Sequence, residues 1–283
     1  MASDLTKSLE ALTPLFDLLS KWQVIMAVSF VYIVLCTAAR RLSPKGISSL
    51  AYLIASVHML ALSGFSAALS TIICQELIVF FSPLSIFTSL CDAENLIWKS
   101  GALGIIQNLN ILLKIIEFHH TFWMALAGRH NAVTQFQIYH NVVLLWMCWS
   151  QTGPGSSAVQ WLPILLNCFV HVFMYLCMFQ VYRGGRTPFF SSLPMFQFVQ
   201  AVLTSLAILA VLTSRLLHDF IDPVQFPRCS GSWTSFFGAT VIALCYPLGY
   251  MVLHKPATDT WLAERGLGLF FSIGRNLKNE KTD

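Results

Sequence analysis

Residues 159–182 read VQWLPILLNCFVHVFMYLCMFQVY, a run without Asp, Glu, Lys or Arg. About 20 mostly apolar residues are enough to cross a bilayer as an α-helix, so this run predicts a transmembrane helix. We therefore expect an all-α polytopic membrane protein with about seven transmembrane helices. Six other apolar runs lie near residues 22–39, 47–81, 105–126, 138–150, 190–217 and 233–253. The run at 138–150, the fourth along the chain, is short.

The composition agrees with this class. Of the 283 residues, 56% are hydrophobic and 11% are charged, against roughly a quarter charged in a soluble domain. This excludes a water-soluble globule and leaves no room beside the spans for a second domain, so residues 1–283 are expected to form a single membrane domain. The net charge is +4, but the basic residues form no cluster that would follow a phosphate backbone. The expected partners are membrane lipids, and nucleic acid is not one of them.

Lysine and arginine in the short loops predict the orientation, because cytosolic loops carry an excess of them. With seven spans, the richer side holds Arg40, Arg41, Lys45, Arg129, Arg183, Arg186, Lys255, Arg265, Arg275, Lys278 and Lys281. The poorer side holds Lys7, Lys21, Lys99, Arg215 and Arg228. The C-terminus is therefore expected in the cytosol and the N-terminus on the other side.

This orientation places two cysteines, Cys91 and Cys229, in loops outside the cytosol. An oxidising lumen would permit a disulfide between them. Two free thiols in these loops remain the alternative.

Ionisable residues at membrane depth are costly and usually mark function, and the run 105–126 contains several of them. Asn110, Lys114, Glu117 and Thr121 follow helical spacing and share one face, with His120 beside them. Lys114 and Glu117 can pair at i,i+3. The stripe either holds two helices together or lines a polar cavity.

Two further polar groups lie in the next two spans. Gln137, His140 and Asn141 stand at i, i+3 and i+4, so their side chains converge on one patch, and the amides can orient the imidazole. His171 and Tyr175 stand at i,i+4, one turn after Asn167. Taken alone, this last pair would be explained by a structural hydrogen bond.

Together these segments resemble the ELO family of very-long-chain fatty acid elongases. The residues that carry the resemblance are KIIEFHHT at 114–121, similar to K-x-x-E-x-x-D-T; QIYHN at 137–141, where the family has H-x-x-H-H; HVFMY at 171–175, similar to H-x-x-M-Y; and PMFQFVQ at 194–200, similar to T-x-x-Q-x-x-Q. The resemblance implies a barrel of six helices around a narrow acyl tunnel, with the first span packed outside.

The resemblance also implies an activity, the condensation of an acyl-CoA with malonyl-CoA to a 3-ketoacyl-CoA, with no bound cofactor. By the same resemblance His140 and His171 are the catalytic residues, since imidazole can act as a nucleophile or as a general base. The supporting residues are then Gln137, Asn141, Lys114, Glu117, His120, Thr121, Tyr175, Gln197 and Gln200. Metal dependence is not expected, because the histidines near the presumed cavity are too few for an iron site.

This chain departs from the family pattern at Gln137, Asn141 and His120, which replace two histidines and an aspartate. Glutamine and asparagine form hydrogen bonds but cannot take up a proton or attack a thioester. The alternative is therefore a catalytically silent, elongase-like structural or lipid-binding subunit of a membrane complex, whereas an enzyme would be a monomer or a small homo-oligomer. A transporter or receptor is disfavoured, because the polar residues form a compact patch and no continuous path.

Substrate binding and location are expected from the same resemblance. The phosphates of coenzyme A would meet Arg129, His130, Arg183 and Arg186 at the cytosolic mouth, although a solvated positive-inside loop explains these residues equally well. The expected location is the endoplasmic reticulum membrane. The mitochondrial inner membrane is the alternative if the chain is a silent subunit.

Overall fold

The structure is a computed structural model of the chain. It describes residues 12–42, 49–81, 86–96, 102–126, 135–152, 155–183, 192–241 and 244. Within these residues all regular structure is helical and no strand occurs, which confirms the predicted all-α class.

The helices follow one another through short connections. Their bounds are α2 (Thr13–Leu19), α3 (Trp22–Leu42), α4 (Ser49–Phe81), α5 (Ile86–Cys91), α7 (Ala102–Leu126), α8 (Gln135–Ser150), the 3₁₀ helix η2 (Ala158–Gln160), α9 (Trp161–Tyr182) and α10 (Leu193–Phe220). Residues 233–241 are also helical.

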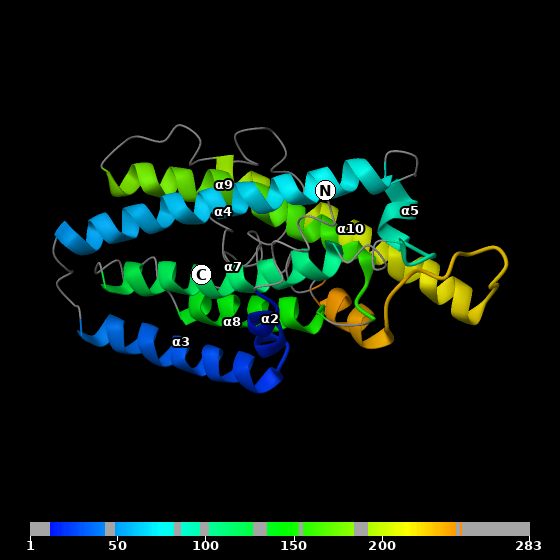
Figure 1. The fold of residues 1–283 in the computed structure, drawn as a ribbon, viewed down its shortest axis with the longest axis horizontal. Coiled ribbons are helices and arrows are strands. Elements are labelled where there is room, and N and C mark those ends of the chain that lie inside the picture. The colour runs from blue at the N-terminus through cyan, green and yellow to red at the C-terminus, as the bar shows by residue number, and fades with distance from the viewer. Residues whose placement is uncertain are drawn as a thin grey trace, which may run out of the picture.

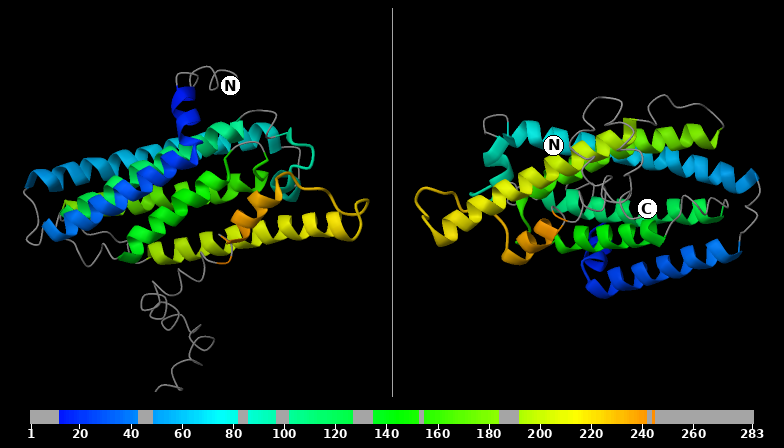
Figure 2. Two further views of the ribbon diagram at one scale, coloured as in Figure 1. Left: turned by 90° about the horizontal axis from the view of Figure 1, so that it is seen from below. Right: turned by 180° about the vertical axis from the view of Figure 1, so that it is seen from behind.

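The long helices run side by side along the longest axis of the molecule (Figure 1). The most extensive packing is between α4 and α9, whereas α7 contacts α3, α4, α8 and α9. The view from behind shows α7 in the middle of the bundle and α3 at its edge (Figure 2). Side chains of α7 are therefore well placed to reach several helices at once.

Within the described residues, four helical segments are long and apolar enough to cross a membrane, namely Trp22–Arg41, Leu53–Ile78, Ala158–Gln180 and Met195–Phe220. Of the other predicted spans, α7 carries Lys114 and Glu117 near its middle, and α8 has 16 residues, about 24 Å of helix against a hydrocarbon core of about 30 Å. The predicted span at 233–253 is described only at 233–241 and 244. The count of seven stays a prediction.

The outer surface of the bundle is apolar. Phe30 on α3 is 67% exposed, and Val57 on α4 and Leu206 on α10 are exposed to a similar degree. Exposed apolar side chains on spanning helices suit contact with lipid. Inside the bundle polar contacts occur, such as the hydrogen bond that the Ser63 hydroxyl donates to the Val172 carbonyl across the α4–α9 interface.

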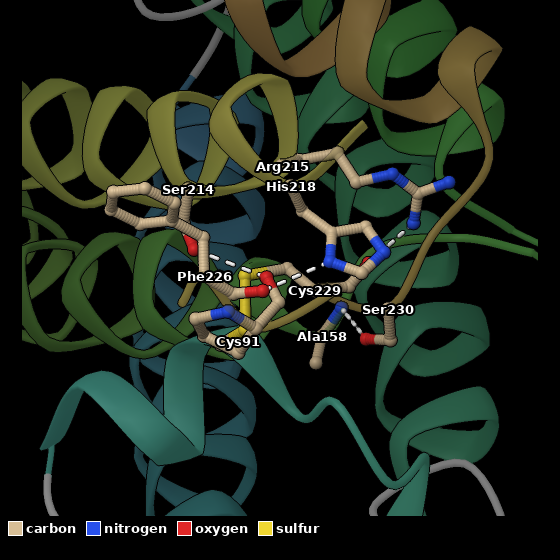
Figure 3. Close-up of a disulfide and its surroundings, with 9 residues drawn as sticks. Cys91, Ala158, Ser214, Arg215, His218, Phe226, Cys229 and Ser230 are labelled. Carbon is tan, nitrogen blue, oxygen red and sulfur yellow. Dashed lines mark hydrogen bonds between the residues drawn. A yellow bond between two sulfur atoms is a disulfide. The ribbon is translucent and has the colours of Figure 1, made fainter. Parts of the chain in front are cut away.

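One end of the bundle is closed by a disulfide between Cys91, at the end of α5, and Cys229, after α10 (Figure 3). This is the first of the two possibilities that the sequence left open for these cysteines. The adjacent Ser230 amide donates to the Cys91 carbonyl over 2.8 Å, and the Arg215 guanidinium donates to the Cys229 carbonyl over 2.7 Å. We call this end, where the Ala158 amide also meets Ser230, the disulfide end.

Candidate functional site

A charged cluster lies between α7 and α9. Lys114 and Glu117 of α7 form an ion pair with Nζ and Oε2 3.0 Å apart, and their side chains are 5% and 11% exposed. From α9, His171 places Nδ1 2.7 Å from Glu117 Oε1, and Asn167 accepts a hydrogen bond from Lys114 Nζ over 2.6 Å. The two predicted segments KIIE and HVFMY therefore meet through direct contacts.

The hydrogen bonds fix which nitrogen of His171 carries the proton. A carboxylate only accepts hydrogen bonds, so Nδ1 must donate its proton to Glu117. Asn167 turns its oxygen to Lys114, which leaves its amide nitrogen, 3.3 Å away, to donate to His171 Nε2. His171 is thus held as the neutral tautomer with a lone pair on Nε2.

Aromatic contacts extend the cluster along α9. Tyr175 is 2% exposed, and its ring centroid lies 5.2 Å from that of His171 and 5.9 Å from that of His120. Both contacts are edge-on, so Tyr175 packs against His171 and His120 through aromatic ring contacts. His120 is also buried, and the cluster thereby includes this predicted supporting residue.

A second polar contact joins α8 to its neighbours. The Asn141 amide donates to Tyr32 Oη on α3 and to Thr121 Oγ1 on α7, each over 2.9 Å. The residue before it, His140, is half-buried on the same helix. Thr121 lies four residues, about one turn, from Glu117. The segment of α8 that carries His140 therefore approaches α7 one turn away from the carboxylate that holds His171.

A cavity of about 80 Å³ lies next to the charged cluster. Its polar lining comes from α7, α9, α10, the 3₁₀ helix η2 and the segment that follows α8, and consists of Gln107, Asn110, Lys114, Gln151, Gln160, Asn167, Gln200 and Thr204. Leu144, Met147, Cys148, Pro163 and Ile164 complete the wall. The polar stripe of α7 therefore faces a cavity and also holds two helices together.

The remaining predicted residues are placed as follows. Gln200 lines the cavity, whereas Gln197 contacts Met174, with Nε2 3.8 Å from the sulfur. Arg183 follows α9 and lies over the Phe179 ring, exposed to solvent. The side chain of Gln137, and residues Arg129, His130 and Arg186, lie outside the described part of the structure.

The spacing of polar residues along the sequence does not identify every residue of the site. Asn167 was visible one turn before His171, but its link to Lys114 spans 53 residues. Gln151 and Gln160 stand at the ends of apolar runs, where a polar residue is ordinarily read as part of a loop. Thr204 is an inconspicuous residue inside an apolar helix, and only the packing of α10 shows that it faces a cavity.

Comparison with known proteins gives concordant matches. Fatty acid elongase A of Dictyostelium discoideum is 27% identical over 192 residues, 64% of this chain and 67% of that protein. Putative fatty acid elongase 1 of Schizosaccharomyces pombe is 24% identical over 227 residues, 80% of this chain and 66% of that protein. The chain thus spans about two thirds of the length of these relatives. The model of the ELO family, described as the GNS1/SUR4 family, matches residues 17–255, and the chain belongs to that family.

Proposed function

We propose that the protein is a fatty acid elongase that condenses an acyl-CoA with malonyl-CoA to give a 3-ketoacyl-CoA two carbons longer. Family membership supports a role in fatty acid elongation. The observation that carries the proposal is the 2.7 Å contact between Glu117 and His171. It gives a buried imidazole a fixed orientation inside an otherwise apolar bundle.

The reaction needs no bound cofactor. The bond between the malonyl carboxylate and C2 breaks and releases carbon dioxide, leaving a carbanion at C2 of the remaining thioester. The carbanion attacks the carbonyl carbon of the acyl group, and the acyl carbon–sulfur bond breaks. The leaving thiolate takes a proton and departs as coenzyme A. A carbanion survives only where water is excluded, a condition that the buried side chains around His171 favour.

His171 supplies the basic nitrogen in this proposal. Its Nε2 lone pair takes up a proton, which makes the ring cationic, and the ring gives this proton to the leaving thiolate. Glu117, bonded to Nδ1, stabilises that charge, as a buried carboxylate does for the histidine of a hydrolase triad. Lys114 keeps Glu117 ionised and in place. His140 acts from α8 as the second imidazole.

The substrates approach from the end of the bundle opposite the disulfide. Arg183 lies there, at the end of α9, and together with Arg129, His130 and Arg186 it would bind the phosphates of coenzyme A. Charge complementarity supports this assignment, since arginine is a preferred phosphate ligand. With the same polarity, we expect the C-terminus in the cytosol and the disulfide in the lumen of the endoplasmic reticulum.

The test uses microsomes that contain the expressed protein. They receive radiolabelled malonyl-CoA and acyl-CoAs of graded length, and labelled 3-ketoacyl-CoA is measured. We expect product from the parent chain and none from His171→Ala or His140→Ala. His119→Ala is the matched control. Because His119 is exposed on α7, this variant should leave the rate unchanged. Absence of product with every acyl-CoA would overturn the proposal.

The contacts of Asn141 favour a second candidate, a catalytically silent lipid-binding subunit. Where the family resemblance places a histidine, this amide ties α8 to Tyr32 and Thr121, which is a structural role. A silent subunit should co-purify in mild detergent with stoichiometric partners, and His140→Ala and His171→Ala should leave that assembly intact. An enzyme should purify as a monomer or a small homo-oligomer.

A further inference from the structure

The cavity lies on one side of the charged cluster. Along α7 its lining runs from Gln107 to Lys114 and stops before Glu117, and along α9 it includes Asn167 but not His171. Gln107 lies nearest the start of α7 and bonds to Ser156, in the segment that leads into the disulfide end. The cavity therefore occupies the space between the reacting histidine and the disulfide end.

The far wall of the cavity is closed by satisfied amides. Gln107 exchanges hydrogen bonds with Ser156 at 3.2 and 3.3 Å. Gln151 donates to the Ser235 carbonyl over 3.0 Å and accepts from the Ser235 hydroxyl over 2.6 Å. These two side chains are fixed by partners, and they lie at the part of the cavity lining nearest the disulfide end.

Three other lining atoms are buried and have no partner among the described residues. They are Asn110 Oδ1, Gln160 Nε2 and Thr204 Oγ1, on side chains of residues that are 4–5% exposed. Leaving a buried polar atom without a hydrogen bond destabilises the folded protein. Three such atoms around one cavity indicate a site that a hydrogen-bonding ligand completes.

The lining also indicates the charge of that ligand. The three ammonium protons of Lys114 are directed to Glu117 and Asn167, and the charges of Lys114 and Glu117 cancel. The unpartnered atoms are an amide oxygen, an amide nitrogen and a hydroxyl, which together offer both acceptors and donors. A hydroxyl group, which itself donates and accepts, fits this set better than a carboxylate or an ammonium group.

We propose that the cavity is a subsite for a hydroxyl group on the acyl chain of the substrate, remote from the thioester. The inference rests on the proposed elongase function, because it takes the reacting carbon to lie at His171. Gln107 and Glu117 are ten residues apart on α7, about 15 Å. The hydroxyl therefore belongs at or near the end of a chain of medium length, such as ω-hydroxydecanoyl-CoA.

Binding without malonyl-CoA tests the subsite apart from the reaction. The purified protein in detergent is titrated with ω-hydroxydecanoyl-CoA and with decanoyl-CoA, and the dissociation constants are compared. We expect the hydroxylated thioester to bind about tenfold more tightly, the effect of roughly one additional well-made buried hydrogen bond. Equal affinity, or tighter binding of decanoyl-CoA, would mean that the cavity holds water only and would overturn the inference.

Two pairs of variants test whether the preference for the hydroxylated thioester arises in the cavity. Thr204→Val and Gln160→Leu remove unpartnered polar atoms and should abolish the preference for the hydroxylated thioester. Their controls on the same helical segments, Thr213→Val and Gln180→Leu, change exposed side chains and should retain it. A preference that persists in both cavity variants would place the hydroxyl elsewhere and contradict the subsite. Thr204→Val keeps the side-chain volume, so it answers the question even if Gln160→Leu fails to fold.

Addition of malonyl-CoA then separates this inference from the proposed function. If decanoyl-CoA is elongated but the hydroxylated thioester is not preferred in binding, the subsite is wrong and the elongase function stands. If the hydroxylated thioester binds preferentially but neither is elongated, the subsite stands and the elongase function is wrong.

Discussion

Lys114 and Glu117 form the contact on which the rest of the site depends. Glu117 bonds to Lys114 and to His171, and Lys114 also reaches Asn167. Each charge is therefore compensated inside an apolar bundle. Removing one partner leaves the other charge buried and unpaired, a change that costs about 3–5 kcal/mol in proteins.

This pairing predicts that the losses of stability caused by replacing Lys114 and Glu117 are strongly non-additive. Lys114→Met and Glu117→Gln should each lower the midpoint of thermal unfolding in detergent severely, and the double variant should be more stable than either single one. The control Lys21→Met changes an exposed lysine and should have little effect. If the double variant loses as much stability as the sum of the two single ones, the charges do not support each other.

At the level of elements, α7 is the hub of the bundle. It contacts α3, α4, α8 and α9, and its polar residues serve two purposes, since Asn110 and Lys114 line the cavity while Glu117 and Thr121 bond to other helices. A helix surrounded by protein can carry polar groups at membrane depth, which explains why α7 is less uniformly apolar than α9.

The tie between α8, α3 and α7 gives a prediction at this scale. Asn141→Leu removes two hydrogen bonds that join three helices, and it should reduce stability by about 1–3 kcal/mol. The measurement is the unfolding midpoint in detergent, compared with Val143→Leu, which changes an exposed residue of the same helix. Equal midpoints for the two variants would show that Asn141 does not hold the helices together.

Helical periodicity explains how much of the site could be predicted. It placed Lys114, Glu117 and Thr121 on one face, and the i,i+3 pair is present. It could not show that Asn141 meets Tyr32, 109 residues away, because such contacts depend on how helices pack. The polar stripe of α7 indicated a cavity as one of two possibilities, but most of its lining could not be predicted, since it combines residues such as Gln107 and Thr204 that share no local pattern.

At the scale of the molecule, apolar side chains face outward and a small polar cluster lies inside, which is the arrangement expected of a membrane protein. Composition and apolar runs were sufficient to predict this class. They could not place α5 or the loop after α10, whose positions are fixed by contacts at the disulfide end, including the bond from the His218 ring to the Phe226 carbonyl (Figure 3).

The disulfide gives a prediction for the whole chain. Cys91 and Cys229 are separated by 138 residues, and cross-links that close long loops can stabilise by several kcal/mol. The double variant Cys91→Ser/Cys229→Ser should therefore unfold at a lower temperature than the parent. Cys74→Ser, which removes an exposed free thiol, should not.

Thiol counting checks the same bond directly. The denatured protein, treated with a maleimide of high mass, should gain two more labels after reduction than before it, because two of the eight cysteines are joined. The same number of labels under both conditions would contradict the disulfide.

The central claim, that His171 and His140 catalyse condensation, is tested most directly with purified protein and one turnover of substrate. Malonyl-CoA labelled with a carbon isotope in its free carboxyl group is mixed with an acyl-CoA, and products are followed by mass spectrometry. The account predicts that labelled carbon dioxide, free coenzyme A and a 3-ketoacyl-CoA two carbons longer appear in equal amounts, and that all three are lost in His171→Ala. A protein that binds acyl-CoA but forms no 3-ketoacyl-CoA with any chain length would contradict it.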